Sequence, residues 1–182
     1  MSSCVKLIKP VRLTDHRGYF AETYSRSKYA EMGIEGEFVQ DNHSLSRDIA
    51  TLRGMHFQAP PHAQAKLIRC GRGAIFDVAV DIRKGSPTYG QWVGHELSAK
   101  NGHQLYIPVG FAHGFVTLEP ECEIVYKCSD YYAPQTEGAL RWDDPALGVE
   151  WPLKGAVILS EKDANAPCLK DLDSPFTWGG YK

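Results

Sequence analysis

The sequence has no long apolar run, no CxxC motif and no strong excess of either charge. A membrane-spanning helix needs about 20 consecutive apolar residues, so we expect no membrane partner. The 20 Lys and Arg residues stand against 22 Asp and Glu, which gives a net charge of -2 and argues against a nucleic-acid partner. Lys6 and Lys9 interrupt the N-terminal stretch where an export signal would be apolar, so we expect none.

Cysteine is present but in a pattern that excludes two uses. The five residues are odd in number and widely spaced, at positions 4, 70, 122, 128 and 168. This spacing favours neither a disulfide framework nor a zinc site built from cysteines. We therefore expect reduced thiols and a cytoplasmic location.

The length and composition fit one globular unit. The chain has 182 residues, of which 43% are hydrophobic, and these values are typical of a folded domain with a sizeable core. We find no internal repeat and no linker rich in Gly or Ser. The sequence therefore predicts a single domain over residues 1–182.

Alternating patterns dominate the middle of the chain. In residues 74–81 the apolar Phe76, Val78 and Val80 fall on one face, as in a strand. Further strands are expected at residues 67–70, 104–107, 114–118 and 123–129. Short helices are expected at residues 25–32, with a Ser cap and a Gly stop, and from Ser160, which can cap a turn. The pattern favours an all-β sandwich or barrel with small terminal helices.

Two of the seven histidines lie in informative surroundings. His56 is a polar residue among apolar neighbours, as on the inner wall of a barrel, and His113 ends a Pro-x-Gly-x-x-His motif typical of cupins, which we place just before a strand. A metal-binding cupin has His-x-His and a later Glu, but Gln58 replaces the second His and residues 59–72 contain no Glu. Too few ligands remain, so we predict no metal site.

A histidine in a pocket without metal favours acid–base chemistry, because imidazole titrates near neutral pH. Lys66, ten residues after His56, could reach the same pocket and stabilise an enolate, and Tyr126 on an alternating strand could donate a proton. The ordinary alternatives are a solvated lysine and a core tyrosine. Arginines suited to anions stand at positions 17, 53, 69, 72, 83 and 141.

Seven motifs follow one another in a characteristic order. They occupy residues 15–22, 38–44, 52–58, 65–69, 74–81, 108–115 and 141–145. Together they resemble the dTDP-4-dehydrorhamnose 3,5-epimerase family over nearly the whole chain. The resemblance implies a cupin-like double-stranded β-helix, or jelly roll, that works as a homodimer without metal or organic cofactor. It implies a dTDP-linked 4-keto-6-deoxyhexose as substrate, inverted at C3 and C5.

The resemblance also implies roles for individual residues. His56 would be the base, oriented by Asp163, while Lys66 would stabilise the enolate and Tyr126 would return a proton on the opposite face. The residues that would bind the substrate are Arg17, Phe20, Glu22, Gln40, Asp41, Asn42, Arg53, His113, Tyr132, Glu137 and Lys162. Among them Tyr132 would stack on thymine. Some of these contacts would cross a dimer interface.

Several alternatives stay open at this point. The same residues serve enzymes that invert only C3 or only C5, and keto-sugar isomerases share the fold. A metal-dependent oxygenase is a further alternative, and Gln58 argues against it. Another is a non-catalytic sugar-binding cupin, and the set of acid–base residues argues against that. His62 is another basic residue near His56, which we interpret as a loop or nucleotide contact.

Overall fold

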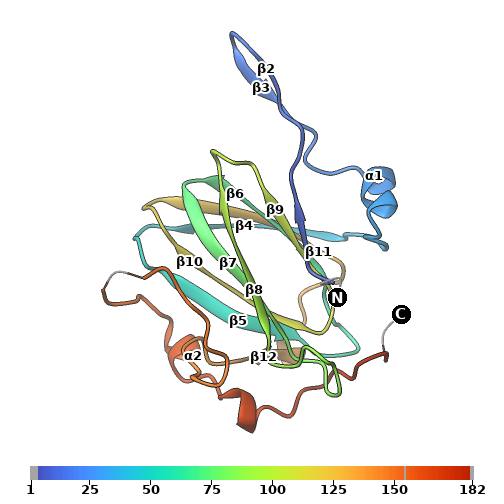
Figure 1. Ribbon diagram of the computed structural model, residues 1–182, viewed down its shortest axis with the longest axis vertical. Coiled ribbons are helices and arrows are strands. Elements are labelled where there is room, and N and C mark those ends of the chain that lie inside the picture. Colours follow the sequence, from blue (N-terminus) through green and yellow to red (C-terminus); the bar gives the residue numbers. More distant parts are fainter. Residues whose placement is uncertain (1–3, 154, 181–182) are drawn as a thin grey trace.

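The computed structural model describes residues 4–153 and 155–180. Within these residues most strands belong to two five-stranded sheets (Figure 1). The first sheet has the order β1 (Lys6–Ile8), β9 (Gln104–Ile107), β6 (Lys66–Arg72), β11 (Cys122–Cys128) and β4 (Gln40–Ser46). The second has the order β12 (Glu137–Ala139), β5 (Leu52–Gln58), β10 (Phe111–Thr117), β7 (Ala74–Asp81) and β8 (Trp92–Ser98). Neighbouring strands in both sheets are antiparallel.

The two sheets pack face to face as a jelly roll, which confirms the predicted fold class. Because side chains alternate along a strand, each sheet sends one row of residues inward. The core between them contains Ile68 and Ile124 from the first sheet, and Ile75, Leu97 and Phe115 from the second. Strands distant in the sequence thus contribute side chains to one interior, where a cavity can be lined from both sides.

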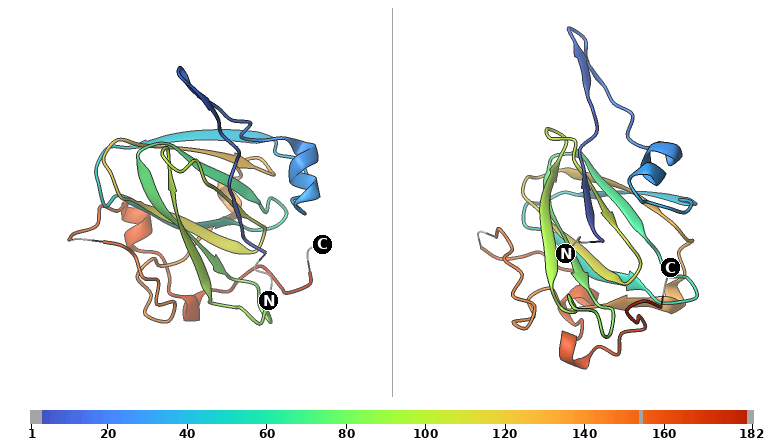
Figure 2. Two further views of the ribbon diagram at one scale, coloured as in Figure 1. Left: turned by 45° about the horizontal axis from the view of Figure 1, so that its top comes forward. Right: turned by 45° about the vertical axis from the view of Figure 1, so that its right-hand side comes forward.

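The outer face of each sheet is covered by a different part of the chain. Helix α1 (Arg26–Glu31) lies by the first sheet, and its Tyr29 packs with Ile8 and Leu67. The C-terminal third runs beneath the second sheet, where Leu140 and Phe176 join a second apolar cluster (Figure 2). This part includes α2 (Glu161–Ala164) and two 3-10 helices, Pro134–Thr136 and Leu169–Asp171.

A hairpin stands apart from the sheets. Strands β2 (Leu13–Asp15) and β3 (Gly18–Phe20) pair with each other and project away from the body of the protein (Figures 1 and 2). Its apolar side chains are largely exposed, including Leu13 at 65% and Phe20 at 69%. This hairpin is not among the elements predicted from the sequence.

Most predicted elements are confirmed, with two corrections. β7 and β9 have the predicted bounds, and β11 is displaced by one residue. β10 begins at Phe111, so His113 lies within the strand and not before it, because the strand pairs with β7 along its whole length. Ser25 occupies the N-cap position of α1, but its side chain makes no capping hydrogen bond. Ser160 does cap α2, accepting from the Asp163 amide at 3.1 Å.

Two glycines bring β5 and β10 unusually close together. Gly54 has a φ of +118°, and a Cβ there would lie 2.5 Å from the Gly114 Cα. A Cβ on Gly114 would in turn meet the Met55 Sδ at 2.7 Å. Only residues without a side chain fit this crossing. His56, two residues after Gly54, and His113, just before Gly114, are direct partners in the strand register.

Candidate active site

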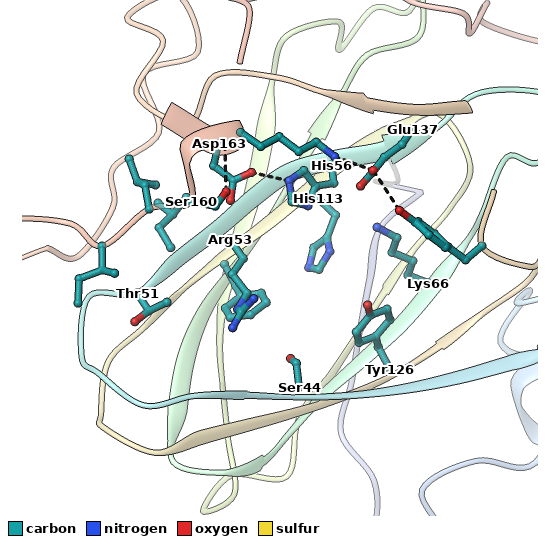
Figure 3. Close-up of a pocket in the computed structure, with 16 residues that line it drawn as sticks. Ser44, Thr51, Arg53, His56, Lys66, His113, Tyr126, Glu137, Ser160 and Asp163 are labelled. Carbon is teal, nitrogen blue, oxygen red and sulfur yellow. Dashed lines mark hydrogen bonds and ion pairs between the residues drawn. The ribbon is translucent and has the colours of Figure 1, made fainter. Parts of the chain in front are cut away.

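A cavity of about 710 Å³ opens between the two sheets. Its lining combines residues from β5, β6, β10 and β11 with residues from the segment that leads into α2 (Figure 3). Of the predicted site residues, the cavity brings together Arg53, His56, Lys66, His113, Tyr126, Tyr132, Glu137, Lys162 and Asp163. Residues as far as 107 positions apart in the sequence, such as His56 and Asp163, therefore meet in one place.

His56 and Asp163 form a close pair. The His56 Nε2 lies 2.6 Å from the Asp163 Oδ1, and Asp163 is buried while His56 is partly open to the cavity. Burial raises the pKa of Asp163, but hydrogen bonds with His56, Ser160 and the Gly54 amide outweigh it and hold that pKa below its usual value. An ionised carboxylate accepts hydrogen bonds, so His56 donates through Nε2–H and its Nδ1 can accept a proton.

Tyr126 and Lys66 come from the opposite sheet. Burial raises the pKa of the Tyr126 phenol and outweighs the opposing effects of a hydrogen bond with Asn42 and the charge of Arg53, so the phenol keeps its proton. Burial lowers the pKa of Lys66, while the charges of Asp77 and Glu137 partly oppose that effect. Figure 3 shows His56 and Asp163 on one wall of the cavity and Tyr126 on the facing wall. A ligand between them would meet a base on one side and an acid on the other.

The mouth of the cavity carries a cluster around Glu137. Its carboxylate forms an ion pair with Lys162 at 2.6 Å and accepts from the Tyr132 hydroxyl at 3.4 Å. Arg53 lies along the same cavity, where its Nε donates to the Ser46 Oγ at 3.1 Å. Positive groups and an aromatic ring at one opening suit an anionic ligand with a planar base.

Gln40 and Asn42 reach a small adjoining pocket. It shares His56, Lys66 and Tyr126 with the main cavity. Gln40 donates to the Asn42 Oδ1 at 3.0 Å, and its own Oε1 accepts from the Tyr132 amide at 2.9 Å. These two residues therefore support the position of the Tyr132 backbone.

Four predicted binding residues lie away from the cavity within this chain. Asp41 points to the outer face of β4 and pairs with Lys127 at 2.8 Å, because alternation turns it opposite to its neighbours. Arg17, Phe20 and Glu22 lie on or just after the projecting hairpin. Arg17 pairs with Asp15 at 2.6 Å, and Glu22 pairs with Lys28 at 2.8 Å.

One buried polar residue of this region, Asp77, was not predicted from the sequence. Its Oδ1 accepts from the His113 Nε2–H at 2.5 Å, and it is fully buried. An acidic residue on the apolar strand 74–81 was the available signal. Ser44, Thr51 and Ser160 also line the cavity and carried no signal of comparable strength.

No group of three or more His, Cys, Asp or Glu side chains suited to a metal ion occurs in the described ranges. Gln58, at the position of the second cupin ligand, has another use. Its amide nitrogen donates to the carbonyl oxygens of His62 at 2.7 Å and Tyr131 at 3.1 Å, and its oxygen accepts from the Ala133 amide at 3.0 Å. Gln58 thereby joins the loop after β5 to the turn that carries Tyr132. The prediction of a pocket without metal stays a prediction.

Comparison with known proteins identifies the family. A family model described as dTDP-4-dehydrorhamnose 3,5-epimerase matches residues 3–171. This chain belongs to that family. An epimerase of this name from Sinorhizobium fredii is 51% identical over 174 residues, covering 96% of this chain and 89% of the relative. One from Salmonella typhimurium is 53% identical over 166 residues, covering 91% and 90%.

Solved structures agree with the assignment to the epimerase family. A 3,5-epimerase from Legionella pneumophila, in complex with dTDP-4-keto-L-rhamnose, has a TM-score of 0.89 at 48% identity and covers 93% of this chain and 89% of that chain. A 3'-monoepimerase from Streptomyces bikiniensis, in complex with dTDP-quinovose, has a TM-score of 0.86 at 36% identity, covering 91% and 84%. The chain is therefore an epimerase. Separately, no helix in its described part is long and apolar enough to cross a membrane.

We expect Gln58→Leu to destabilise this epimerase by about 2 kcal/mol, because two partly buried backbone carbonyls and one buried amide lose their partner. Urea unfolding would measure the loss, and hydrogen exchange should rise in residues 129–133. The control is Gln64→Leu, which removes a single bond, to the Asp130 carbonyl. Equal effects of the two variants would contradict the special role of Gln58.

Proposed function

We propose that this epimerase converts dTDP-4-keto-6-deoxy-D-glucose to dTDP-4-keto-L-rhamnose by inverting C3 and C5. The observation that carries the proposal is the placement of the His56–Asp163 pair and the Tyr126 phenol on facing walls of one cavity. The 4-keto group acidifies the C–H bonds at both neighbouring carbons. A base on one face of the ring and a proton donor on the other face give inversion.

In the first step, the free nitrogen of neutral His56 takes a proton from C3 or C5. The electrons of the broken C–H bond form the enolate, whose charge lies on O4. The carboxylate of Asp163 stabilises the resulting imidazolium and keeps its ring oriented. The ammonium of Lys66 stabilises the enolate oxygen, and this effect is strong in a site that excludes water.

In the second step, the Tyr126 phenol donates a proton to the same carbon from the opposite face. Its raised pKa ensures that the proton is present at neutral pH. His56 then loses its proton and Tyr126 regains one from solvent, so protons and electrons balance. Because electrons are neither gained nor lost overall, the reaction as written requires no redox cofactor.

We assign the nucleotide to the mouth of the cavity. Arg53 and Lys162 would bind the diphosphate, and Tyr132 would stack on thymine, supported by Gln40, Asn42 and Glu137. His113 would contact the sugar. The structure of the Legionella relative with a dTDP-sugar supports this class of ligand.

The remaining binding residues lead to a homodimer proposal. Arg17, Phe20 and Glu22 lie on or beside an exposed hairpin that reaches away from its own cavity. A hairpin with exposed apolar side chains suits a protein interface, and in a twofold dimer each hairpin can reach the other subunit. We propose that these three residues complete the partner's site and that Asp41 lies near the interface. The cytoplasmic location is also proposed, supported by five free cysteines.

His56→Ala should abolish turnover, a loss of at least about 100-fold, because it removes the proposed base from the wall opposite Tyr126. The measurement is proton NMR of dTDP-4-keto-6-deoxyglucose with the protein in D2O. The wild type should place deuterium at both C3 and C5, and His56→Ala at neither. The control is His103→Ala, which removes a histidine of the loop before β9, outside the lining of the cavity, and should behave as the wild type.

Exchange at only one carbon would favour a monoepimerase, the activity named for the Streptomyces bikiniensis relative. No exchange by the folded wild type would contradict the proposed substrate.

Tyr126→Phe should still exchange substrate hydrogens with solvent while forming epimerised product at least about 100-fold more slowly, because only the proton donor is lost. Comparing deuterium uptake with product formation in one NMR time course would measure both. Tyr131→Phe removes an exposed hydroxyl beside the site and is the matched control. Unchanged product formation in Tyr126→Phe would exclude the phenol as the acid.

A hybrid dimer tests whether Arg17 acts across the interface. Arg17→Ala and His56→Ala should each have little activity alone, but coexpressed they should recover about a quarter of wild-type activity. The reason is that half of the dimers are then mixed, and each mixed dimer has one complete site. No recovery, with mixed dimers present by mass spectrometry, would contradict the proposal.

A further inference from the structure

A second histidine–carboxylate pair lies beside the first. The His113 Nε2 lies 2.5 Å from the Asp77 Oδ1, and His113 stands directly opposite His56 in the register of β10 and β5. The histidines of the two pairs thus lie on adjacent strands of the second sheet. The mechanism above uses His56 and Asp163 and gives Asp77 no role.

Asp77 occupies a costly position. It alternates on β7 with Ile75 and Ala79, which both lie in the core between the sheets, and its side chain is fully buried. Its Oδ2 is the one buried side-chain nitrogen or oxygen, among the described residues, without a hydrogen-bond partner. An apolar residue would fill this position at lower cost, so packing does not explain an aspartate here.

Lys66 faces Asp77 from the first sheet. It alternates on β6 with Ile68 and Cys70, which belong to the same core, so its side chain enters the interior. The acidic groups that act on Lys66 are Cys128, Asp77 and Glu137. Burial raises the pKa of the Cys128 thiol, which is therefore neutral.

Of the two carboxylates, Glu137 already pairs with Lys162 at 2.6 Å. Neither histidine that faces Asp77 carries a charge that would pair with it. Burial lowers the pKa of His113 and of His95, the cross-strand neighbour of Asp77 on β8, so both are neutral near pH 7. Asp77 is therefore the carboxylate whose charge is available to Lys66.

We propose that Asp77 is a positioning residue of the epimerase, which orients the His113 ring through one oxygen and balances the positive charge of Lys66. The proposal rests on the proposed role of Lys66 at the enolate. With its Nε2–H donated to Asp77, neutral His113 keeps Nδ1 as an acceptor, which suits a sugar hydroxyl. Attraction to the Asp77 carboxylate offsets the free-energy cost of burying the Lys66 ammonium, so Lys66 stays charged until substrate arrives.

The direction of the pH effect follows from these charges. Burial favours neutral Lys66, and the negative charge of Asp77 favours the ammonium. Without that charge the pKa of Lys66 falls further, and the ammonium is lost at a lower pH. The activity that the wild type loses at alkaline pH should therefore be lost at a lower pH in a variant without the charge of Asp77.

Asp77→Asn is the sharpest test, because the amide oxygen can still accept from the His113 Nε2–H while the charge is gone. The alkaline limb of kcat should move down by about one pH unit or more, which lowers kcat about tenfold beyond that limb. Affinity for dTDP, which occupies the mouth of the cavity, should stay within about twofold. Glu96→Gln, exposed on β8, removes the same charge at the surface and should shift nothing.

Each outcome decides the proposal. A folded Asp77→Asn variant with the wild-type pH profile would overturn it, and so would a loss of kcat by one constant factor at every pH. Absence of solvent exchange in the wild type would instead overturn the proposed function, so the two failures are distinguishable.

A second variant covers the case in which Asp77→Asn does not fold. In Lys66→Met, Asp77 no longer faces a cation, and its charge should draw a proton to His113. Since the charge of Lys66 holds the pKa of His113 down, NMR titration should show that pKa rising. The exposed His16 serves as the internal control. An unchanged His113 titration would overturn the coupling between the two sheets.

Discussion

The hydrogen bond between Asp163 and His56 joins residues 107 positions apart and determines how the rest of the site is arranged. It requires α2 to reach the inner edge of β5, which in turn requires the C-terminal third of the chain to wrap beneath the second sheet. Ser160 begins α2 and accepts from the Asp163 amide, so the helix cap and the carboxylate belong to one local structure. The short helix α2 thus places the Asp163 carboxylate beside His56 on β5.

The glycine crossing of β5 and β10 serves the same arrangement from the other side. Gly54 and Gly114 let the two strands approach, and the Gly54 amide points to Asp163 at 3.5 Å. His56 and His113 consequently lie side by side, each with its own carboxylate. The facing sheet supplies the complementary groups, a cation and a phenol. The two sheets therefore contribute different chemical groups to the two walls of the cavity.

Local patterns in the sequence were sufficient for much of this structure. The alternation in residues 74–81 and 104–107 predicted two strands with their bounds, and Ser160 predicted the cap of α2. The isolated polar positions His56 and His113 pointed to the cavity. The contact between His56 and Asp163 came from the family resemblance, because no local pattern encodes a contact over such a separation.

The features that local patterns did not predict depend on how distant parts of the chain pack together. The projecting hairpin is short and exposed, so burial leaves no periodic signal in it. Asp41 shares a motif with Gln40 and Asn42, yet alternation sends it to the opposite face. The role of Gln58 was equally hidden, since its three partners lie on two loops that meet only in the folded chain.

Gln58 also bears on how this enzyme relates to metal-dependent cupins. A histidine at this position would restore one ligand of the metal motif, but it would release the turn that carries Tyr132. The position that holds a metal ligand in metal-dependent cupins thus holds two loops together in this enzyme. A gradual exchange between the two chemistries would pass through proteins with neither a complete metal site nor an ordered nucleotide-binding turn, which is an evolutionary barrier built into a single side chain.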